Sequence, residues 1–410
     1  MQTFRMKTTI IDISGLTEET QRRAQVFREP EAIAIMEDAM EKIRQAAEVL
    51  RGGGLVAFPT ETVYGIGAAA FDEEAVRRVY EAKGRPQDNP MIVHIARASD
   101  ISLLAKSLTP SVVKLADAFW PGPLTMVLEK KEEVPDCTTG GLNTVGVRLP
   151  DSLAALELIR AAGVPIAAPS ANLSGSPSPT KAAHVIADLD GKVDVILAGP
   201  ECRVGIESTV IDMTTDPPLI LRPGVVTRDD IETVLEAPVG YSPLLNNDAA
   251  PPPRSPGMKP PGALASASPL SNNDAAPPPH SPGMKPPDAP AGASPLSNND
   301  APPPRSPGMR YRHYAPKARM LVVEGARDRV RSEVYRLKTA NENLGLAVGV
   351  LYFEEKSFLE AAHDFYADLR ELDDSGVDLI IAGALPATDG VGFAVMNRMM
   401  KAAGYNIVRV

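Results

Sequence analysis

Residues 31–67 read EAIAIMEDAMEKIRQAAEVLRGGGLVAFPTETVYGIG. Apolar side chains recur at helical spacing between residues 36 and 50, and the glycines at 52–54 end that helix. Residues 55–58 form a short apolar run of the kind that predicts a buried strand. A helix that leads through a glycine stop into such a strand is typical of an α/β domain.

Helix and strand patterns continue to alternate after this stretch. Asp72 is placed to cap a helix that has one apolar face. The alternation predicts an α/β domain with some parallel strand pairing over residues 1–241. Further apolar runs predict strands at Met91–Ile95, Thr125–Leu128, Val145–Leu149, Val164–Ala168, Val193–Leu197, Thr209–Asp212 and Leu219–Leu221.

A second α/β pattern fills residues 318–410. Helices are predicted near Asp328–Asn341 and Ser357–Asp374, and they separate apolar runs that look buried on both faces, as parallel strands do. The pattern predicts a small, Rossmann-like, doubly wound unit. Its strands are expected at Met320–Val323, Leu346–Phe353 and Val377–Ala382.

Residues 242–317 are predicted to link the two domains. The part from 242 to 310 contains half of the chain's 40 prolines and no Val, Ile, Phe, Tyr, Trp or Cys, so it cannot bury enough apolar area to offset the entropy of ordering. A unit that opens with Ser-Pro-Leu and closes with Ser-Pro-Gly-Met occurs three times in it. We interpret these copies as duplicated linker sequence, because they have no apolar face on which to stack.

Composition excludes several classes of protein. The 42 basic and 52 acidic side chains give a formal charge of −10, so the chain lacks the overall positive charge that is typical of nucleic-acid-binding proteins. Cys137 and Cys202 form no C-x-x-C motif, so a disulfide framework and a structural zinc site are not expected. No apolar stretch approaches the roughly eighteen residues of a membrane helix, and the first fifteen residues lack a signal-peptide core. We expect a soluble cytoplasmic protein.

Hydroxyl groups follow the strand at residues 55–58. If Pro59–Gly67 stays extended, Thr60, Thr62 and Tyr64 point to one side, because side chains of a strand alternate. Three hydroxyls would then line one surface. The alternative is an edge strand with a glycine-rich turn, since the Gly-x-Gly element alone is weak evidence for a phosphate loop.

Cations lie at positions where anions could bind. Lys83 and Arg85 lie just past a helix end, and Pro86 biases Arg85 toward an extended backbone, so both cations would face the same way, as a polyphosphate site requires. The alternative is that they complement the helix dipole. Arg148 and Arg222 each end a predicted strand, where a salt bridge is the alternative.

A polar loop follows the strand at Val164–Ala168. Ser170 and Asn172 are two residues apart in it, at the end of a strand, where α/β proteins bind ligands. A simple Asx or Ser turn explains the same residues equally well. Walker-type phosphate loops, zinc-protease motifs and Ser-His-Asp patterns are absent from the sequence, so covalent catalysis is not indicated.

Eight segments of the sequence carry a resemblance to a known family. They are Pro59–Gly67, Lys83–Pro90, Trp120–Thr125, Val147–Pro150, Ala168–Gly175, Glu207–Val210, Leu221–Gly224 and Ser306–Pro316. The first seven together resemble the YrdC family. With the tail at residues 306–316, the chain resembles the long, two-domain threonylcarbamoyl-AMP synthase form over nearly its whole length outside the repeats. The resemblance implies a YrdC-like twisted α/β domain with a mixed sheet.

The resemblance also implies a reaction. L-Threonine, bicarbonate and ATP would give threonylcarbamoyl-adenylate and diphosphate, and the product would pass to the machinery that makes threonylcarbamoyladenosine in tRNA. Mg²⁺ is expected with ATP, and no protein metal ligand is assigned. Arg148 would hold the threonine carboxylate, and Lys83 and Arg85 would be catalytic, although Lys83 near threonine or carbamate is equally sensible chemistry.

The remaining site residues are also implied only by the resemblance. Threonine is expected beside Thr62, His94, Ala168 and Ser208. Tyr311 or Tyr314 is expected to touch the nucleotide where the tail closes over the site. The nucleotide is expected beside Arg85, Asn89, Thr144, Ser170, Asn172, Ser178 and Arg222.

The sequence is compatible with other functions and leaves two segments without an assigned role. An RNA-binding YrdC-like module and a carbamoyltransferase are the alternative functions. The C-terminal domain is interpreted as a regulatory or lid-supporting unit, with Asn397 and Arg398 as capping or interface residues. The first two linker copies lack the aromatic tail, and we interpret them as decoys whose deletion, over residues 242–293, tests whether they have a role.

Overall fold

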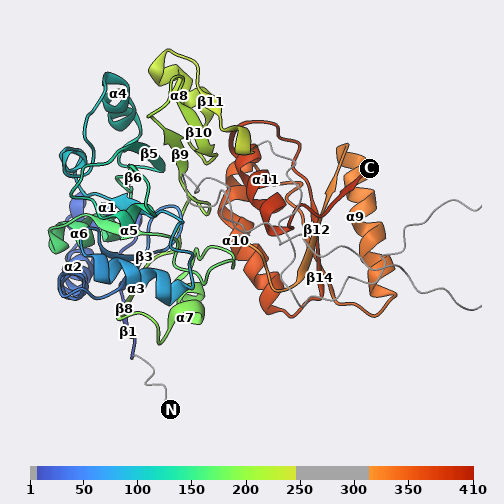
Figure 1. The fold of residues 1–410 in the computed structure, drawn as a ribbon. Coiled ribbons are helices and arrows are strands. Elements are labelled where there is room, and N and C mark those ends of the chain that lie inside the picture. Colours follow the sequence, from blue (N-terminus) through green and yellow to red (C-terminus); the bar gives the residue numbers. More distant parts are fainter. Residues whose placement is uncertain (1–6, 246–313) are drawn as a thin grey trace, which may run out of the picture. The chain divides into compact units, whose positions relative to one another are not determined.

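The protein is described by a computed structural model that covers residues 7–245 and 314–410 (Figure 1). Apart from residues 242–245, which open the first copy, the linker copies with their Ser-Pro-Gly-Met units lie outside these residues, as does Tyr311. Most of the elements predicted from the sequence are present, with bounds that differ by a few residues. In the described part of the chain, no helix has the length and apolar character needed to span a membrane.

The first domain is built on one mixed sheet. Its strand order among the described residues is β1-β8-β2-β3-β7-β4-β6-β5-β9-β10-β11. The strands are β1 (Thr9–Asp12), β2 (Val56–Phe58), β3 (Gly65–Ala69), β4 (Ile92–His94), β5 (Leu124–Glu129), β6 (Thr144–Arg148), β7 (Ile166–Ala168), β8 (Val195–Ala198), β9 (Thr209–Asp212), β10 (Leu219–Arg222) and β11 (Gly240–Tyr241).

Helices pack on this sheet through their apolar faces. In α2, Ile43 and Leu50 are buried in a cluster that also contains Leu158 of α6 and Val56 of β2. The helices are α1 (Glu18–Gln25), α2 (Pro30–Arg51), α3 (Glu73–Lys83), α4 (Pro110–Phe119), α5 (Asp136–Thr139), α6 (Leu153–Ala162), α7 (Ala182–Leu189) and α8 (Arg228–Leu235), with short 3-10 turns at Ala98–Leu103 and Pro243–Leu245.

The bounds of α3 follow from its two caps. The Asp72 side chain accepts a hydrogen bond from the Ala75 backbone N–H at 3.0 Å, as predicted for the N-terminus. Gly84 ends the helix in the left-handed conformation, with φ of 64°. Lys83 is therefore the last residue of the helix, and the prediction that it lies just past the helix end is wrong.

The strands at the centre of the sheet bring distant residues together. β4 pairs in parallel with β6, and this register sets His94 opposite Arg148. β4 also pairs antiparallel with β7, which sets Ala168 opposite Ile92. Three segments that are far apart in the sequence therefore end side by side.

The C-terminal domain is a parallel, doubly wound sheet, as predicted. Its order is β13-β14-β12-β15, with α9 packed on one face and α10 and α11 on the other (Figure 1). Neither α11 nor the short edge strand β15 was predicted from the sequence. The elements are β12 (Arg319–Glu324), α9 (Arg327–Glu342), β13 (Val348–Leu351), α10 (Phe358–Asp374), β14 (Leu379–Gly383), α11 (Gly390–Ala402) and β15 (Ile407–Arg409).

Residues 61–63 bend, so the extended conformation on which the prediction of three hydroxyls along one strand face depends is absent, although Thr60, Thr62 and Tyr64 all line one pocket. Thr60 Oγ1 accepts hydrogen bonds from the backbone N–H groups of Thr62 and Val63, which folds the segment into a turn. The turn brings the Thr60 and Thr62 hydroxyls to 2.9 Å from each other. The Tyr64 hydroxyl instead donates to the Gly199 carbonyl at 2.8 Å.

Candidate active site

A pocket lies where the ends of the central strands meet the polar loops. Its lining combines four cationic side chains with hydroxyl and amide groups. The lining residues are Thr60, Thr62, Val63, Tyr64, Gly65, Lys83, Arg85, Ile92, His94, Arg148, Ala168, Pro169, Ser170, Asn172, Ser174, Gly175, Glu207, Ser208, Arg222 and Tyr314.

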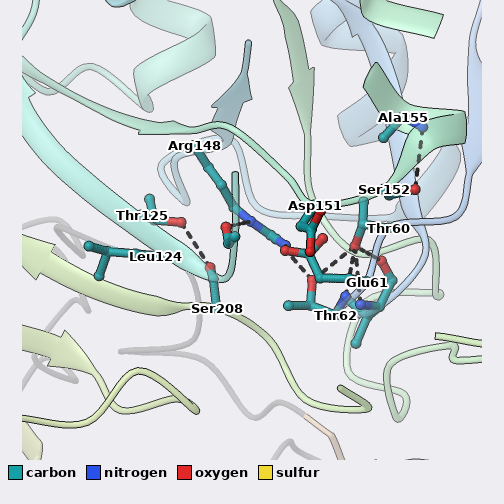
Figure 2. Close-up of polar contacts among 12 residues, drawn as sticks. Thr60, Glu61, Thr62, Leu124, Thr125, Arg148, Asp151, Ser152, Ala155 and Ser208 are labelled. Carbon is teal, nitrogen blue, oxygen red and sulfur yellow. Dashed lines mark hydrogen bonds and ion pairs between the residues drawn. The ribbon is translucent and has the colours of Figure 1, made fainter. Parts of the chain in front are cut away.

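Arg148 enters the pocket from the end of β6, and its guanidinium points toward Glu61 and Thr62 (Figure 2). Its Nη2 lies 2.6 Å from Glu61 Oε1, and both side chains are almost completely buried. Its Nη1 donates to the Thr62 hydroxyl at 2.9 Å, and its Nε donates to the Gly122 carbonyl at 3.2 Å. The turn at residues 60–62 thus orients the guanidinium, and the salt bridge left open by the sequence is present.

Lys83 is the last residue of α3, and it lines the pocket together with Arg85. The Lys83 ammonium donates to the carbonyls of Ser170 and Asn172, so it holds the polar loop that follows β7. Burial, with Arg85 nearby, lowers the pKa of Lys83 well below its usual value. Arg85 Nη2 donates to Asn89 Oδ1 and to the Pro90 carbonyl, both at 2.8 Å, and burial lowers the pKa of Arg85 to about 10.

The loop after β7 is organised by its own side chains. The Ser170 hydroxyl donates to Asn172 Oδ1 at 2.6 Å. Asn172 Nδ2 in turn donates to the carbonyls of Leu173 and Ser176. Hydrogen bonds from both side chains and from Lys83 therefore fix the loop, and Ser170 and Asn172 also line the pocket.

The opposite wall is formed by the residues before β9 and at the end of β10. Arg222 donates to the Ser208 carbonyl through Nε and to the Ser208 hydroxyl through Nη2, each at 3.1 Å. The Ser208 hydroxyl also lies 2.8 Å from that of Thr125 (Figure 2). Although burial opposes it, Arg398 and Arg222 hold the pKa of Glu207 below its usual value, so this carboxylate is ionised.

His94 is a buried, neutral side chain of the pocket. Its ring meets Phe58 edge to face, with 6.4 Å between the ring centroids. Burial, together with the charge of Arg148, lowers the pKa of His94 to about 3. His94 can therefore offer a neutral ring nitrogen to a ligand throughout the physiological pH range.

This neutral histidine predicts a loss of stability in mild acid. Below pH 6.5 the unfolded chain protonates His94 and the folded chain does not, so folding becomes less favourable as pH falls from 6.5 toward 3. At pH 5 the cost is about 2 kcal/mol. Urea unfolding of the wild type and of His94→Gln at pH 7 and pH 5 measures it. The variant should lose less stability between the two pH values, and an equal loss would contradict the prediction.

The structure brings most, but not all, of the predicted site residues to this pocket. Asn89 does not line it and instead holds Arg85. Ser178 does not line it and donates to Glu207 Oε1 at 2.6 Å. Thr144 begins β6, away from the pocket lining. The residues that do line it are Thr62, Lys83, Arg85, His94, Arg148, Ala168, Ser170, Asn172, Ser208, Arg222 and Tyr314.

Two acidic residues of the site, Glu61 and Glu207, were not predicted from the sequence. Glu61 and Glu207 both lie inside motifs that were singled out, but no function was given to either. Each is buried beside an arginine, and an acidic residue within an otherwise apolar or hydroxyl-rich motif is the signal that could have found them. Within residues 7–245 and 314–410, no group of three or more His, Cys, Asp or Glu side chains is arranged to hold a metal ion.

Two family models match the chain. The model Sua5_yciO_yrdC, described as "Telomere recombination", matches residues 48–224. The model Sua5_C, described as "Threonylcarbamoyl-AMP synthase, C-terminal domain", matches residues 265–404. The two models thus cover both α/β domains.

Relatives match along nearly the whole chain. A threonylcarbamoyl-AMP synthase of Pyrococcus abyssi is 42% identical over 90% of this chain and 96% of its own length. One from Bacillus subtilis is 39% identical over 90% of this chain and 94% of its own length. The crystal structure of P. abyssi Sua5 complexed with L-threonine matches with a TM-score of 0.76 and 40% identity, over 98% of this chain and all of that one. The chain therefore belongs to the threonylcarbamoyl-AMP synthase family, in its two-domain form.

Proposed function

We propose that the chain joins L-threonine, bicarbonate and ATP into threonylcarbamoyl-AMP, with release of diphosphate, in the pocket described above. The observation that carries this proposal is the presence of Arg148 in the same pocket as Lys83, Arg85 and Arg222. These cations suit a reaction that combines a carboxylate substrate with a polyphosphate substrate. The complex of P. abyssi Sua5 with L-threonine supports the same reading.

The reaction needs no nucleophile from the protein. The threonine amine attacks CO₂ derived from bicarbonate and loses a proton, which gives a carbamate. A carbamate oxygen then attacks the α-phosphorus of ATP, the bond to the β-phosphate oxygen breaks, and diphosphate leaves. Burial raises the pKa of Cys202 well above its usual value and also raises that of Cys137, so neither thiol is activated. Positioning and charge neutralisation remain as the tasks of the protein.

We assign the threonine carboxylate to Arg148, which is already oriented by Thr62 and Glu61. Thr62, His94, Ala168 and Ser208 would surround the rest of the amino acid. The phosphates would lie against Lys83, Arg85 and Arg222, with Ser170 and Asn172 on the nucleotide side. Asn89 and Ser178 would act through the pocket residues that they contact, Arg85 and Glu207.

The donors of this pocket do not fit a resident metal ion, because Glu61 and Glu207, the two acidic side chains discussed above, are each paired with an arginine. Mg²⁺ is hard and binds oxygen ligands, and the phosphates of ATP supply them. We therefore assign Mg²⁺ to the substrate, as MgATP. The residues of the pocket would bind the phosphate oxygens that the ion leaves free.

The product is a reactive mixed anhydride, and it is consumed by a transfer to tRNA. We propose that the chain hands it to a separate transferase in the cytoplasm, because the negative net charge of −10 does not favour tight binding of tRNA by this chain itself. A steep salt dependence of tRNA affinity would support the alternative of direct RNA binding.

Diphosphate release from ATP tests the proposal. Omitting threonine or bicarbonate in turn should reduce release to background, because the carbamate is the attacking group. Release without threonine would indicate another adenylating or hydrolytic enzyme. Release without added bicarbonate in CO₂-free buffer would exclude the carbamate route.

A further inference from the structure

Arg398 is a buried cation that the proposed chemistry does not use. It lies on α11 of the C-terminal domain, its side chain has no exposed surface, and it is the largest fully buried side chain among the described residues. A guanidinium is rarely buried in this way unless all of its donors are used. The hydrogen-bond partners of Arg398 therefore indicate its role.

The contacts of Arg398 join two segments of the pocket wall. Its Nε donates to Glu207 Oε2 at 3.1 Å, and its Nη2 donates to the Glu207 carbonyl at 3.3 Å. Its Nη1 donates to the Pro223 carbonyl and, at 3.2 Å, to the Ala394 carbonyl of its own helix. One planar group thus holds the residue before Ser208 and the residue after Arg222.

The two segments that it joins are in close contact with each other. A Cβ atom on Gly224 would lie 2.4 Å from the Thr209 backbone nitrogen, so only glycine permits this approach. Arg222 donates twice to Ser208 across the same junction. A shift of either segment would therefore change the direction of the Arg222 guanidinium.

A second residue of the C-terminal domain supports the same carboxylate. The Tyr366 hydroxyl on α10 lies 3.0 and 3.1 Å from the two oxygens of Glu207. Burying an ion pair costs desolvation energy, and an apolar pair of similar volume is often at least as stable. Stability alone thus gives little reason for this arrangement, whereas the placement of Arg222 gives one.

The charges around this junction suit an anion. Arg222, Arg398 and Lys401 lie near Glu207, so cations outnumber this carboxylate. Burial, together with Arg398 and Arg222, lowers the pKa of Lys401 to about 7. An anionic phosphate group would relieve the repulsion among these cations.

We propose that Arg398 is a positioning residue for the phosphate end of ATP, which it serves by holding the Glu207–Ser208 and Arg222–Pro223 segments in place. This inference rests on the proposed function, because it assumes that Arg222 meets the phosphates. The C-terminal domain then supplies part of the support of the nucleotide site. The threonine end, held by Arg148 and Thr62, does not depend on Arg398.

The test compares substitutions at the junction with a matched control. Arg398→Lys keeps the charge opposite Glu207 but cannot donate to all four acceptors, and Tyr366→Phe removes one hydroxyl and keeps the ring. Arg228→Gln is the control, because it breaks an ion pair with Asp389, the N-cap residue of the same helix α11, and neither residue lines the pocket. ATP and threonine affinities are measured by calorimetry, and KM and kcat by diphosphate release.

Arg398→Lys should weaken ATP binding and raise the KM for ATP by about tenfold, with little change for threonine, because a small misplacement of a binding group has effects of this size or larger. Tyr366→Phe should raise the KM for ATP by a smaller factor. Arg228→Gln should change neither the KM for ATP nor the KM for threonine. If Arg398→Lys weakened the binding of ATP and threonine equally, or if Arg228→Gln weakened ATP binding as much, Arg398 would only hold the domains together. Either result would overturn the proposal.

A double variant covers the case in which Arg398→Lys does not fold. Arg398→Met with Glu207→Gln removes both buried charges, so it should fold, yet it should still bind ATP weakly. Normal ATP affinity in the folded double variant would overturn the inference. Because binding is measured without turnover, a wild type that binds ATP but releases no diphosphate would contradict the proposed function and leave this test intact.

Discussion

Lys83→Met is expected to lower the rate of threonine-dependent diphosphate release by about 10²–10³-fold, the effect typical of removing one preorganised electrostatic group from an active site. Lys83 is buried at the pocket wall, and its ammonium already holds the Ser170–Asn172 loop through two carbonyls. The substitution keeps most of the volume and removes both the charge and the loop contacts. The effect should appear in kcat/KM for ATP.

The same lysine predicts a proton uptake when ATP binds. In the free enzyme, burial and the neighbouring Arg85 lower the pKa of Lys83 well below its usual value, which favours release of its proton. The phosphates add negative charge beside it, which raises the pKa again, and the enzyme takes up protons from the buffer. Calorimetry of ATP binding in two buffers with different ionisation enthalpies measures this uptake.

Lys192→Met is the matched control for both measurements. Lys192 donates to the Asp188 carbonyl at 2.8 Å and does not line the pocket. This variant should keep wild-type kinetics and wild-type proton uptake. If Lys83→Met takes up as many protons as the wild type, the change of charge occurs at another group and the role given to Lys83 is wrong.

Most elements of the fold could be predicted from the sequence, because the strands are short apolar runs and the helices between them begin at recognisable N-cap residues. The doubly wound C-terminal sheet and the cap at Asp72 followed from local patterns. The edge strand β15 was missed because it has only three residues and includes an arginine. Two glycines near the start of α11 made that helix hard to recognise, because glycine lowers helix propensity.

The cationic residues of the site could be predicted from the sequence, but the residues that orient their side chains could not. Arg148 and Arg222 stood out because a cation at the end of an apolar strand is unusual. Their partners follow from long-range contacts: Thr62 is 86 residues from Arg148, and Arg398 is 191 residues from Glu207. The turn at Thr60 was not predicted, because the local pattern favours an extended segment. The Thr60 side chain instead accepts a hydrogen bond from the Thr62 backbone N–H, which stabilises a turn.

Arg148→Leu is expected to have two effects, and they can be separated. The substitution removes the group assigned to the threonine carboxylate, so the KM for threonine should rise by about 10²-fold, which corresponds to the roughly 3 kcal/mol of a hydrogen bond to a charged group. It also leaves Glu61 buried without its cation. The free energy of unfolding should therefore fall by about 3–5 kcal/mol.

A double variant separates the two effects. Arg148→Leu with Glu61→Leu removes the whole buried pair, and replacing such a pair by apolar side chains is often neutral or stabilising. Its unfolding midpoint in urea should return most of the way to that of the wild type, while its affinity for threonine stays low. ATP binding should persist in the double variant, because Lys83, Arg85 and Arg222 are unchanged.

The double variant decides between the two readings of Arg148 that the sequence left open. If Arg148 serves only as a salt-bridge partner, removing both members of the pair restores stability and leaves threonine binding normal. If Arg148 binds the substrate, stability returns without threonine binding. Normal threonine affinity in the stable double variant would thus refute the assignment of the threonine carboxylate to Arg148, while the effects predicted for Lys83 would stand or fall separately, because they concern the phosphates.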